Sequence, residues 1–309
     1  MQRLNMILFY CCCLLFILIT DGASGAAVND TIFPNQTHKD GDTIVSAGGI
    51  FELGFFNPGN SSMRYLGIWY TCSLLDASSM LKISDEGSLQ LLSLRNTLVW
   101  SSPSYKLATN SNPVAQLLET GNLVIRDEVS NNISWQSFDH PGDTWLPGMK
   151  IGVDLVTGIH MNLTSWKTSN NPSLGSYTVW MDTNGYPHLF YERDDVLESR
   201  IEYWNGLGFS GVLSLRPNNL NAFDFVVTDR EIYTILVTNT FVTRMILDPQ
   251  GNFVQLVWND IKQSWQNYAN TLQDFCDRYT LCGPYGICRI NYAPVCSCIG
   301  GFEPRVPKE

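Results

Sequence analysis

The chain has 309 residues, of which 16% are charged and 12% aromatic, and its formal net charge is −10. This composition excludes a disordered chain and is typical of a folded protein rich in strands. The negative charge, without a basic run anywhere, argues against a nucleic-acid partner, because binding to phosphates requires clustered Lys and Arg.

The first segment, residues 1–26, is predicted to be a signal peptide. Arg3 precedes an uninterrupted apolar run over residues 6–19, and small residues follow over residues 22–27. That order of charge, apolar run and small residues is typical of secretion. The alternative is a membrane anchor, but the run is shorter than the roughly 20 residues that span a bilayer. We therefore expect a secreted chain without a membrane span.

Five Asn-X-Ser/Thr sequons support the secretory prediction, because each lies in a polar, turn-like context where a glycan is tolerated. We expect N-glycans at Asn29, Asn35, Asn60, Asn132 and Asn162.

The body of the chain is predicted to be all β, because short alternating apolar runs end in Gly, Asn or Asp turns. Three times a Gly turn opens a pair of strands that ends in a Trp, over residues 87–100, 121–135 and 251–265. A single hairpin is not stable alone, so these copies must pack together. The pattern predicts β-prism or barrel units in tandem, with a boundary in the Pro/Gly-rich segment 140–152.

A cluster of cysteines near the carboxyl end predicts a disulfide-linked unit over residues 271–309. Its members are Cys276, Cys282, Cys288, Cys296 and Cys298. After secretion such a cluster indicates a disulfide framework, whereas a zinc site would require a reducing compartment. We therefore predict no metal site.

No enzyme active site is recognisable in the sequence. The four histidines are scattered and none falls in a nucleophile or metal motif. Glu192, Asp194, Asp195 and Glu198 could imitate the carboxylate pair of a glycosidase, but a solvated run of charged residues explains them better. We expect neither catalysis nor a cofactor.

Six strings of the sequence occur in the order of a known family. They are DGDTIVSAGGIFELGFFNPGNSSMRYLGIWY (40–70), NPVAQLLETGNLVIRD (112–127), WQSFDHPGDTWLPGMKIG (135–152), LTSWKTSNNPSLGSYT (163–178), YWNGLGFSG (203–211) and CDRYTLCGPYGICRINYAPVCSC (276–298). The sequence thereby resembles the extracellular region of plant S-locus glycoproteins and of the related lectin-type S-receptor kinases.

The resemblance implies three parts. They are a bulb-type lectin domain over residues 27–150, a second lectin-like S-locus glycoprotein domain over residues 151–270, and an incomplete EGF-like module over residues 271–309. The family's Trp-Val-Ala-Asn-Arg string is missing after Tyr70, so the first lectin sheet is expected to be shortened. A PAN domain follows in the family, and in receptors a membrane helix and a kinase; we expect none of these within the 309 residues.

The resemblance also implies a pairing of the cysteines. An EGF-like module would join Cys276 to Cys288 and Cys282 to Cys296, which leaves Cys298 unpaired. Cys72 is a further cysteine without a family partner. Because an odd thiol in an oxidising compartment tends to find a partner on another chain, we predict disulfide-linked homodimers.

The family's mannose-binding consensus, Gln-x-Asp-x-Asn-x-Val-x-Tyr, is largely lost. Aligned on the second Gly turn, the candidate carbohydrate-binding residues are Thr120, Asn122 and Val124, and only the last two match the consensus. Each lost polar partner costs roughly 1–3 kcal/mol in a buried site, so we expect very weak mannose binding or none. The alternative, which we favour, is that Asn122 is simply a turn residue.

The resemblance implies an extracellular recognition module that binds a protein, peptide or glycan ligand, as in the recognition of pollen. The chain would be secreted, or held at the plasma membrane if the gene product continues into a membrane segment. The alternative is a truncated product of a receptor-like kinase gene that binds no ligand of its own.

Overall fold

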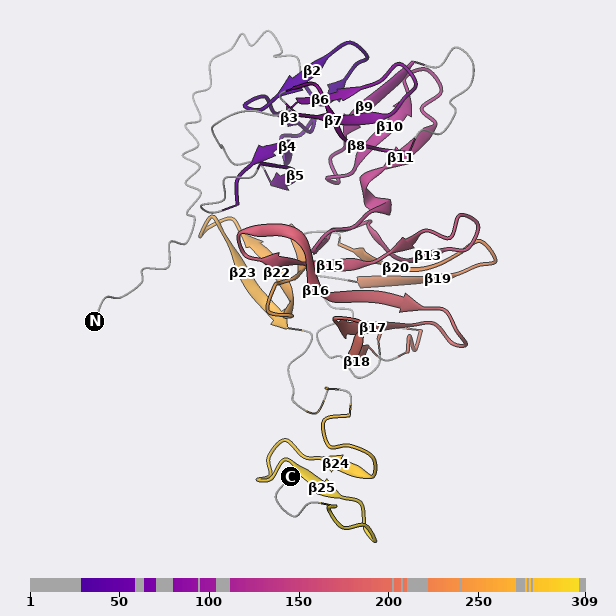
Figure 1. Ribbon diagram of the computed structural model, residues 1–309, viewed down its shortest axis with the longest axis vertical. Coiled ribbons are helices and arrows are strands. Elements are labelled where there is room, and N and C mark those ends of the chain that lie inside the picture. Colours follow the sequence, from indigo (N-terminus) through magenta and orange to yellow (C-terminus); the bar gives the residue numbers. More distant parts are fainter. Residues whose placement is uncertain are drawn as a thin grey trace, which may run out of the picture. The chain divides into compact units, whose positions relative to one another are not determined.

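A computed structural model describes residues 29–58, 64–70, 80–93, 95–103, 112–201, 203–206, 208–209, 222–238, 241–270, 276, 278 and 280–305 (Figure 1). The predicted signal peptide, the sequon at Asn60 and Cys72 lie outside these ranges. Within them the structure is all β apart from one short 3-10 turn, η1 (Ser137–Asp139), which confirms the predicted fold class. None of the helical structure in these ranges is long and apolar enough to cross a membrane.

The strands form two compact units. Residues up to His140 belong to the first unit and most later residues to the second, although residues 169–172 and 257–266 cluster with the first. Three sheets come from strands before Pro141, and three four-stranded sheets and one two-stranded sheet come from strands after it; two sets of three sheets are expected for two β-prisms. The domain boundary after residue 150 remains a prediction.

The first unit contains two four-stranded sheets and one three-stranded sheet. In spatial order, the first sheet is β1 (Thr31–Ile32), β9 (Pro113–Leu117), β10 (Leu123–Asp127) and β11 (Ile133–Gln136); the second is β2 (Thr37–Lys39), β6 (Met80–Ile83), β7 (Leu89–Leu92) and β8 (Leu98–Ser101); the third is β3 (Ile44–Val45), β4 (Phe51–Phe56) and β5 (Tyr65–Tyr70). The three-stranded sheet ends with β5, and residues 71–79, where the sequence predicts a shortening, lie outside the described ranges.

Three four-stranded sheets follow His140 in the chain, and most of their residues belong to the second unit. In spatial order, the first is β12 (Thr144–Trp145), β21 (Thr243–Leu247), β22 (Phe253–Asn259) and β23 (Ser264–Asn270); the second is β14 (His160–Met161), β13 (Lys150–Asp154), β20 (Glu231–Val237) and β19 (Ala222–Val227); the third is β15 (Leu163–Thr168), β16 (Asn171–Asp182), β17 (His188–Arg193) and β18 (Val196–Ile201). Fully buried Trp145, Ile151, Leu163, Met181 and Phe253 belong to the core of this unit.

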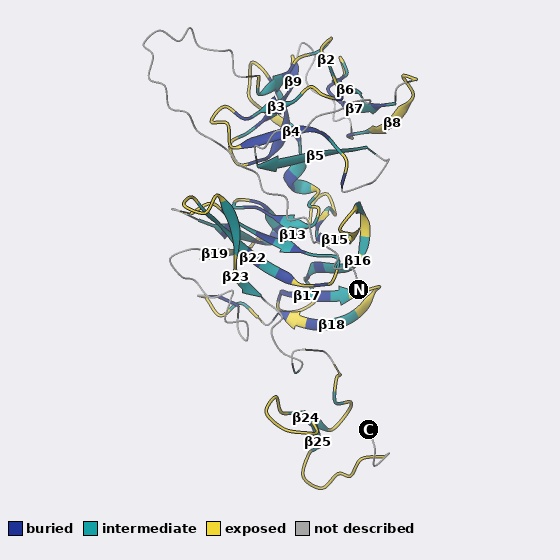
Figure 2. Cartoon of the chain, turned by 90° about the vertical axis from the view of Figure 1, so that its left-hand side faces the viewer, coloured by how far each residue is buried: buried dark blue, intermediate teal, exposed yellow. Residues whose placement is uncertain are grey.

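The three Gly-to-Trp repeats form the hairpins β7–β8, β10–β11 and β22–β23. Gly87, Gly121 and Gly251 precede them with φ angles of 78°, 82° and 85°, a region that only Gly adopts at little cost. The closing tryptophans differ, because Trp135 is 8% exposed and Trp100 is 43% exposed. Trp100 stands on β8, an edge strand whose residues are mostly exposed (Figure 2), so it does not fill a core.

The cysteine cluster forms a separate two-stranded sheet from β24 (Gly286–Cys288) and β25 (Cys296–Cys298). Disulfides join Cys276 to Cys288 and Cys282 to Cys296, with Cα–Cα distances of 5.5 and 5.3 Å, and Cys298 is free and partly exposed. No described residue from 276 to 305 is fully buried (Figure 2). Cross-links therefore take the place of a hydrophobic core in this unit.

Candidate functional site

The candidate carbohydrate residue Asn122 is engaged by its own hairpin. Its Nδ2 donates a hydrogen bond to Gln136 Oε1 at 2.9 Å. Its Oδ1 accepts from Ser137 Oγ at 3.1 Å and from the backbone N–H of Phe138 at 3.2 Å. Asn122 is 7% exposed, so its side chain ties β10 to the end of β11 and to η1.

The other two candidates lie in different environments. Val124 is completely buried in the core of the first unit. Thr120 is exposed at the turn, where its Oγ1 accepts a bond from the backbone N–H of Asn122 at 3.4 Å. Arg126, at the position of the consensus Tyr, donates to Gln116 and Asn131 at 2.8 Å each. The three candidates are neighbours in sequence but do not share one open surface.

A groove that the sequence did not reveal lies on the sheet β15–β16–β17–β18. It is an open cavity of about 380 Å³, at the low end of the ~300–1,000 Å³ of ligand pockets. Its lining residues are Asn162, Gly175, Ser176, Thr178, Trp180, Glu192, Asp194 and Asp195.

The alternation of β16 brings the polar residues of the groove to one face. Val179 and Met181 are buried in the core, so Thr178 and Trp180 lie on the opposite face of the strand. Gly175 allows β16 to approach β15, because a Cβ atom there would lie 2.2 Å from the carbonyl oxygen of Trp166. The alternation was present in the sequence, but the approach of Asn162 and Glu192 to this face required the fold.

Two aspartates in left-handed conformations form the turn between β17 and β18. Asp194 and Asp195 have φ angles of 48° and 63°, and they join the paired residues Arg193 and Val196. Such a conformation costs roughly 1–2 kcal/mol for a residue other than Gly, although Asp tolerates it better than most. The backbone N–H of Asp194 donates to the carbonyl oxygen of Ser176 at 2.8 Å, which fixes the turn against β16.

Two buried polar atoms of groove residues have no hydrogen-bond partner among the described residues. They are Oδ1 of Asn162 and Nε1 of Trp180. Buried polar groups are normally paired, and leaving one unpaired costs roughly 1–3 kcal/mol. Both atoms have almost no accessible surface, so a molecule in the groove could reach them only after a local shift of the side chains. The groove is also lined by Ser176 and Thr178, which carry hydroxyl groups.

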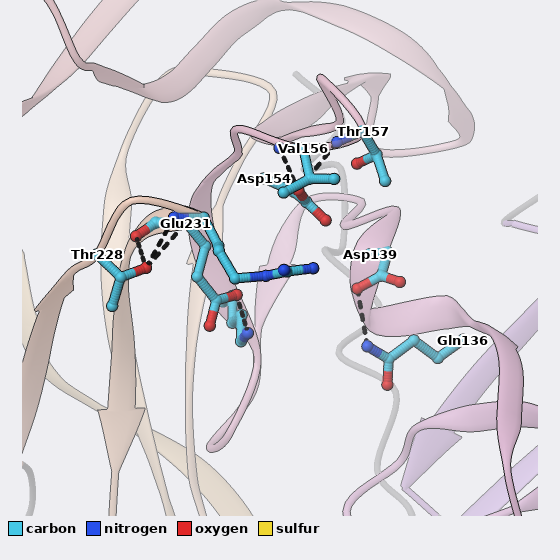
Figure 3. Close-up of polar contacts among 9 residues, drawn as sticks. Gln136, Asp139, Asp154, Val156, Thr157, Thr228 and Glu231 are labelled. Carbon is cyan, nitrogen blue, oxygen red and sulfur yellow. Dashed lines mark hydrogen bonds and ion pairs between the residues drawn. The ribbon is translucent and has the colours of Figure 1, made fainter.

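The carboxylates of the groove differ from other acidic side chains of the protein. Asp139 accepts a bond from a Gln side chain, Asp154 accepts two from backbone N–H groups at 2.8 and 3.0 Å, and Glu231 pairs with a Lys (Figure 3). Those N–H groups lower the pKa of Asp154. Within the part of the chain that the structure describes, Glu192 and Asp195 have no such partner.

The electrostatics of the groove are negative. Arg193 contacts Asp194 at 3.9 Å, but both side chains are largely exposed, so this pair offsets little of the charge. Among the described residues no group of three His, Cys, Asp or Glu side chains is placed to hold a metal ion. Carboxylates that accept hydrogen bonds, and hydroxyl groups that donate or accept them, together suit a neutral polyhydroxyl molecule.

Two family models match the chain. The D-mannose binding lectin model matches residues 71–167 and the S-locus glycoprotein domain model matches residues 200–306. The receptor-like serine/threonine-protein kinase SD1-8 of Arabidopsis thaliana is 38% identical over 88% of this chain and 34% of its own length. The S-locus-specific glycoprotein S6 of Brassica oleracea is 39% identical over 85% of this chain and 65% of its own length.

Solved structures of lectins also match. The two-domain lectin Scilla campanulata agglutinin is 18% identical, with a TM-score of 0.25, over 78% of this chain and 98% of its own. A monomeric mannose-binding lectin from Gastrodia elata is 22% identical, with a TM-score of 0.27, over 35% of this chain and 96% of its own.

The chain spans about a third of the length of the kinase relative and about two thirds of that of the glycoprotein. The extracellular location that the sequence predicts agrees with these relatives. With its lectin and S-locus glycoprotein domains, the chain belongs to the family of S-locus glycoproteins and G-type lectin S-receptor-like kinases.

Proposed function

We propose that this chain is the extracellular recognition module of an S-locus-type receptor or secreted S-locus glycoprotein, and that it binds a neutral glycan in the groove of its second unit. The observation that carries the proposal is a groove lined by hydroxyl-bearing side chains, whose carboxylates Glu192 and Asp195 have no partner among the described residues. The lectin and S-locus glycoprotein matches support a binding function.

A glycan suits these groups better than a peptide does. Sugar hydroxyls both donate and accept, so they can donate to Glu192 and Asp195 and accept from the hydroxyl of Thr178. A peptide would have to carry Lys or Arg to offset the negative charge of the groove. Acidic sugars would be repelled by the same carboxylates. The ligand is therefore expected to be neutral, and a basic peptide is the other outcome that the experiment must detect.

The experiment is a binding assay of the secreted chain carrying Thr164→Ala, which removes the sequon but keeps the Asn162 side chain in the groove. The probes are neutral oligosaccharides of mannose, N-acetylglucosamine, glucose and galactose, a uronic-acid oligosaccharide, and a basic peptide. We expect a neutral oligosaccharide to bind with a dissociation constant near or below the millimolar range, about −4 kcal/mol, and the uronic-acid probe not to bind.

Trp180→Ala in the same background should abolish this binding, whereas Trp100→Ala, which alters an exposed tryptophan of the first unit, should leave it unchanged. Binding that survives Trp180→Ala would place the ligand elsewhere. Binding of the basic peptide but of none of the sugars would show that the ligand is a protein and not a glycan. A folded chain that binds none of the probes would support the alternative of a non-binding product of a receptor-like kinase gene.

A further inference from the structure

The sequon at Asn162 is presented toward the groove. Leu163 between its two key residues is completely buried. Because side chains alternate along a strand, Asn162 and Thr164 lie on the opposite face, and Asn162 lines the cavity. The backbone N–H of Thr164 donates to the carbonyl oxygen of Gly142 at 2.9 Å, which fixes the start of β15.

The other described sequons differ from this one. Asn29, Asn35 and Asn132 are exposed, so a glycan on any of them would extend directly into solvent. Asn162 is half-buried, and the Oδ1 of its amide is fully buried. A sugar attached to Asn162 would therefore begin inside the groove.

We propose that the chain's own N-glycan is the resident occupant of the groove and controls its access to other ligands. This inference rests on the proposed function, because it concerns the same site. In the attachment step, Nδ2 of Asn162 loses one hydrogen and bonds to C1 of an N-acetylglucosamine, and the lipid diphosphate that carried the oligosaccharide leaves. The amide keeps its carbonyl oxygen and one N–H.

The first sugar matches the chemistry of the cavity. Its hydroxyl and acetamido oxygens can accept hydrogen bonds from the hydroxyls of Ser176 and Thr178, which line the cavity. Its hydroxyl groups can donate to the carboxylate of Glu192, which no described residue engages. A cavity of about 380 Å³ suits the core sugars of a glycan, and the rest of the glycan leaves through the open side. The protein would thus fill its own site during secretion.

The test compares glycans on the folded, secreted chain. Peptide mass mapping measures occupancy at Asn162 and Asn132, and an amidase that cleaves the Asn–glycan bond measures how fast each glycan is released. We expect both sites to be occupied and release at Asn162 to be roughly tenfold slower than at Asn132, because the walls of the groove shield the Asn162–glycan bond until a local fluctuation exposes it. After denaturation the two rates should be equal, and Trp180→Ala should speed release at Asn162 alone.

The second measurement is binding of the neutral oligosaccharide panel to three proteins: the wild-type chain, Thr164→Ala, and Asn132→Gln, which removes an exposed glycan. Thr164→Ala should bind roughly tenfold more tightly than the other two, because an attached glycan competes for the groove at a high effective concentration. An unoccupied Asn162, or equal release rates from the folded chain, overturns the inference even if Thr164→Ala binds sugar, and the proposed function then stands alone. Slow release at Asn162 with no binding by Thr164→Ala keeps the resident glycan and overturns the proposed ligand.

Discussion

At the scale of the residue, Asn122 shows how a binding motif can survive in part for a structural reason. The three hydrogen bonds of its amide stay within the β10–β11 hairpin and η1. A side chain with both oxygen lone pairs engaged has only one N–H left for a sugar. Its retention beside the Gly121 turn is explained by folding, without any ligand.

Asn122→Ala should therefore lower stability and leave mannose binding unchanged. The loss of these buried hydrogen bonds should reduce the free energy of unfolding by roughly 1–3 kcal/mol, as measured by denaturant titration. Retention on mannose beads should be very weak for the wild type and for the variant. Millimolar or tighter binding that disappears with Asn122→Ala would show that the second repeat retains a mannose site.

At the scale of the element, the turn before the third hairpin requires Gly for two reasons, its backbone conformation and the lack of space for a side chain. Gly251 has a φ of 85°, and a Cβ atom there would lie 2.3 Å from Oη of Tyr191. That hydroxyl donates to the carbonyl oxygen of Gly251 at 2.6 Å. Burial raises the pKa of Tyr191, so the hydroxyl remains a donor at any physiological pH.

Gly251→Ala should destabilise the second unit by roughly 2–4 kcal/mol, the sum of a left-handed backbone penalty and overpacking. Gly158→Ala is the matched control, because Gly158 has a φ of 73° but no atom within 4 Å of its Cβ position. It should cost only the backbone part, roughly 1–2 kcal/mol. Equal losses of Tm in the two variants would exclude the contact with Tyr191.

Hairpins and groove differ in how far the sequence could predict them. A positive φ and a two-residue alternation are local, so Gly87, Gly121 and Gly251 identified their turns without the fold. The groove depends on the convergence of Asn162, Trp180 and Glu192 from three segments. The residues next to them in the sequence give no sign of the groove, and the acidic residues around Asp194 and Asp195 were interpreted only as solvated charge. The exposure of Trp100 could not be predicted either, because which strand lies at the edge of a sheet depends on how the strands pair.

At the scale of the whole molecule, the free Cys298 makes the chain reactive toward a second copy. It is partly exposed, whereas the four cysteines around it are paired. On non-reducing gels we expect dimers that reduction dissolves and that Cys298→Ser largely removes. The control is Ser297→Ala on the same strand, which should leave the dimers unchanged. A clean monomer in which peptide mapping finds Cys298 joined to Cys72 would contradict this prediction.

No described residue around β24 and β25 is buried, so the folding of this segment depends on whether its disulfides can form in the compartment that holds the chain. Two cross-links, each closing a loop of a dozen residues or so, stabilise it by roughly 3 kcal/mol apiece. The two β-prisms have cores of their own and do not depend on these bonds. The same polypeptide made in the cytosol would keep its prisms and lose this last part. A folded segment around β24 and β25 would therefore show that the chain has passed through an oxidising compartment.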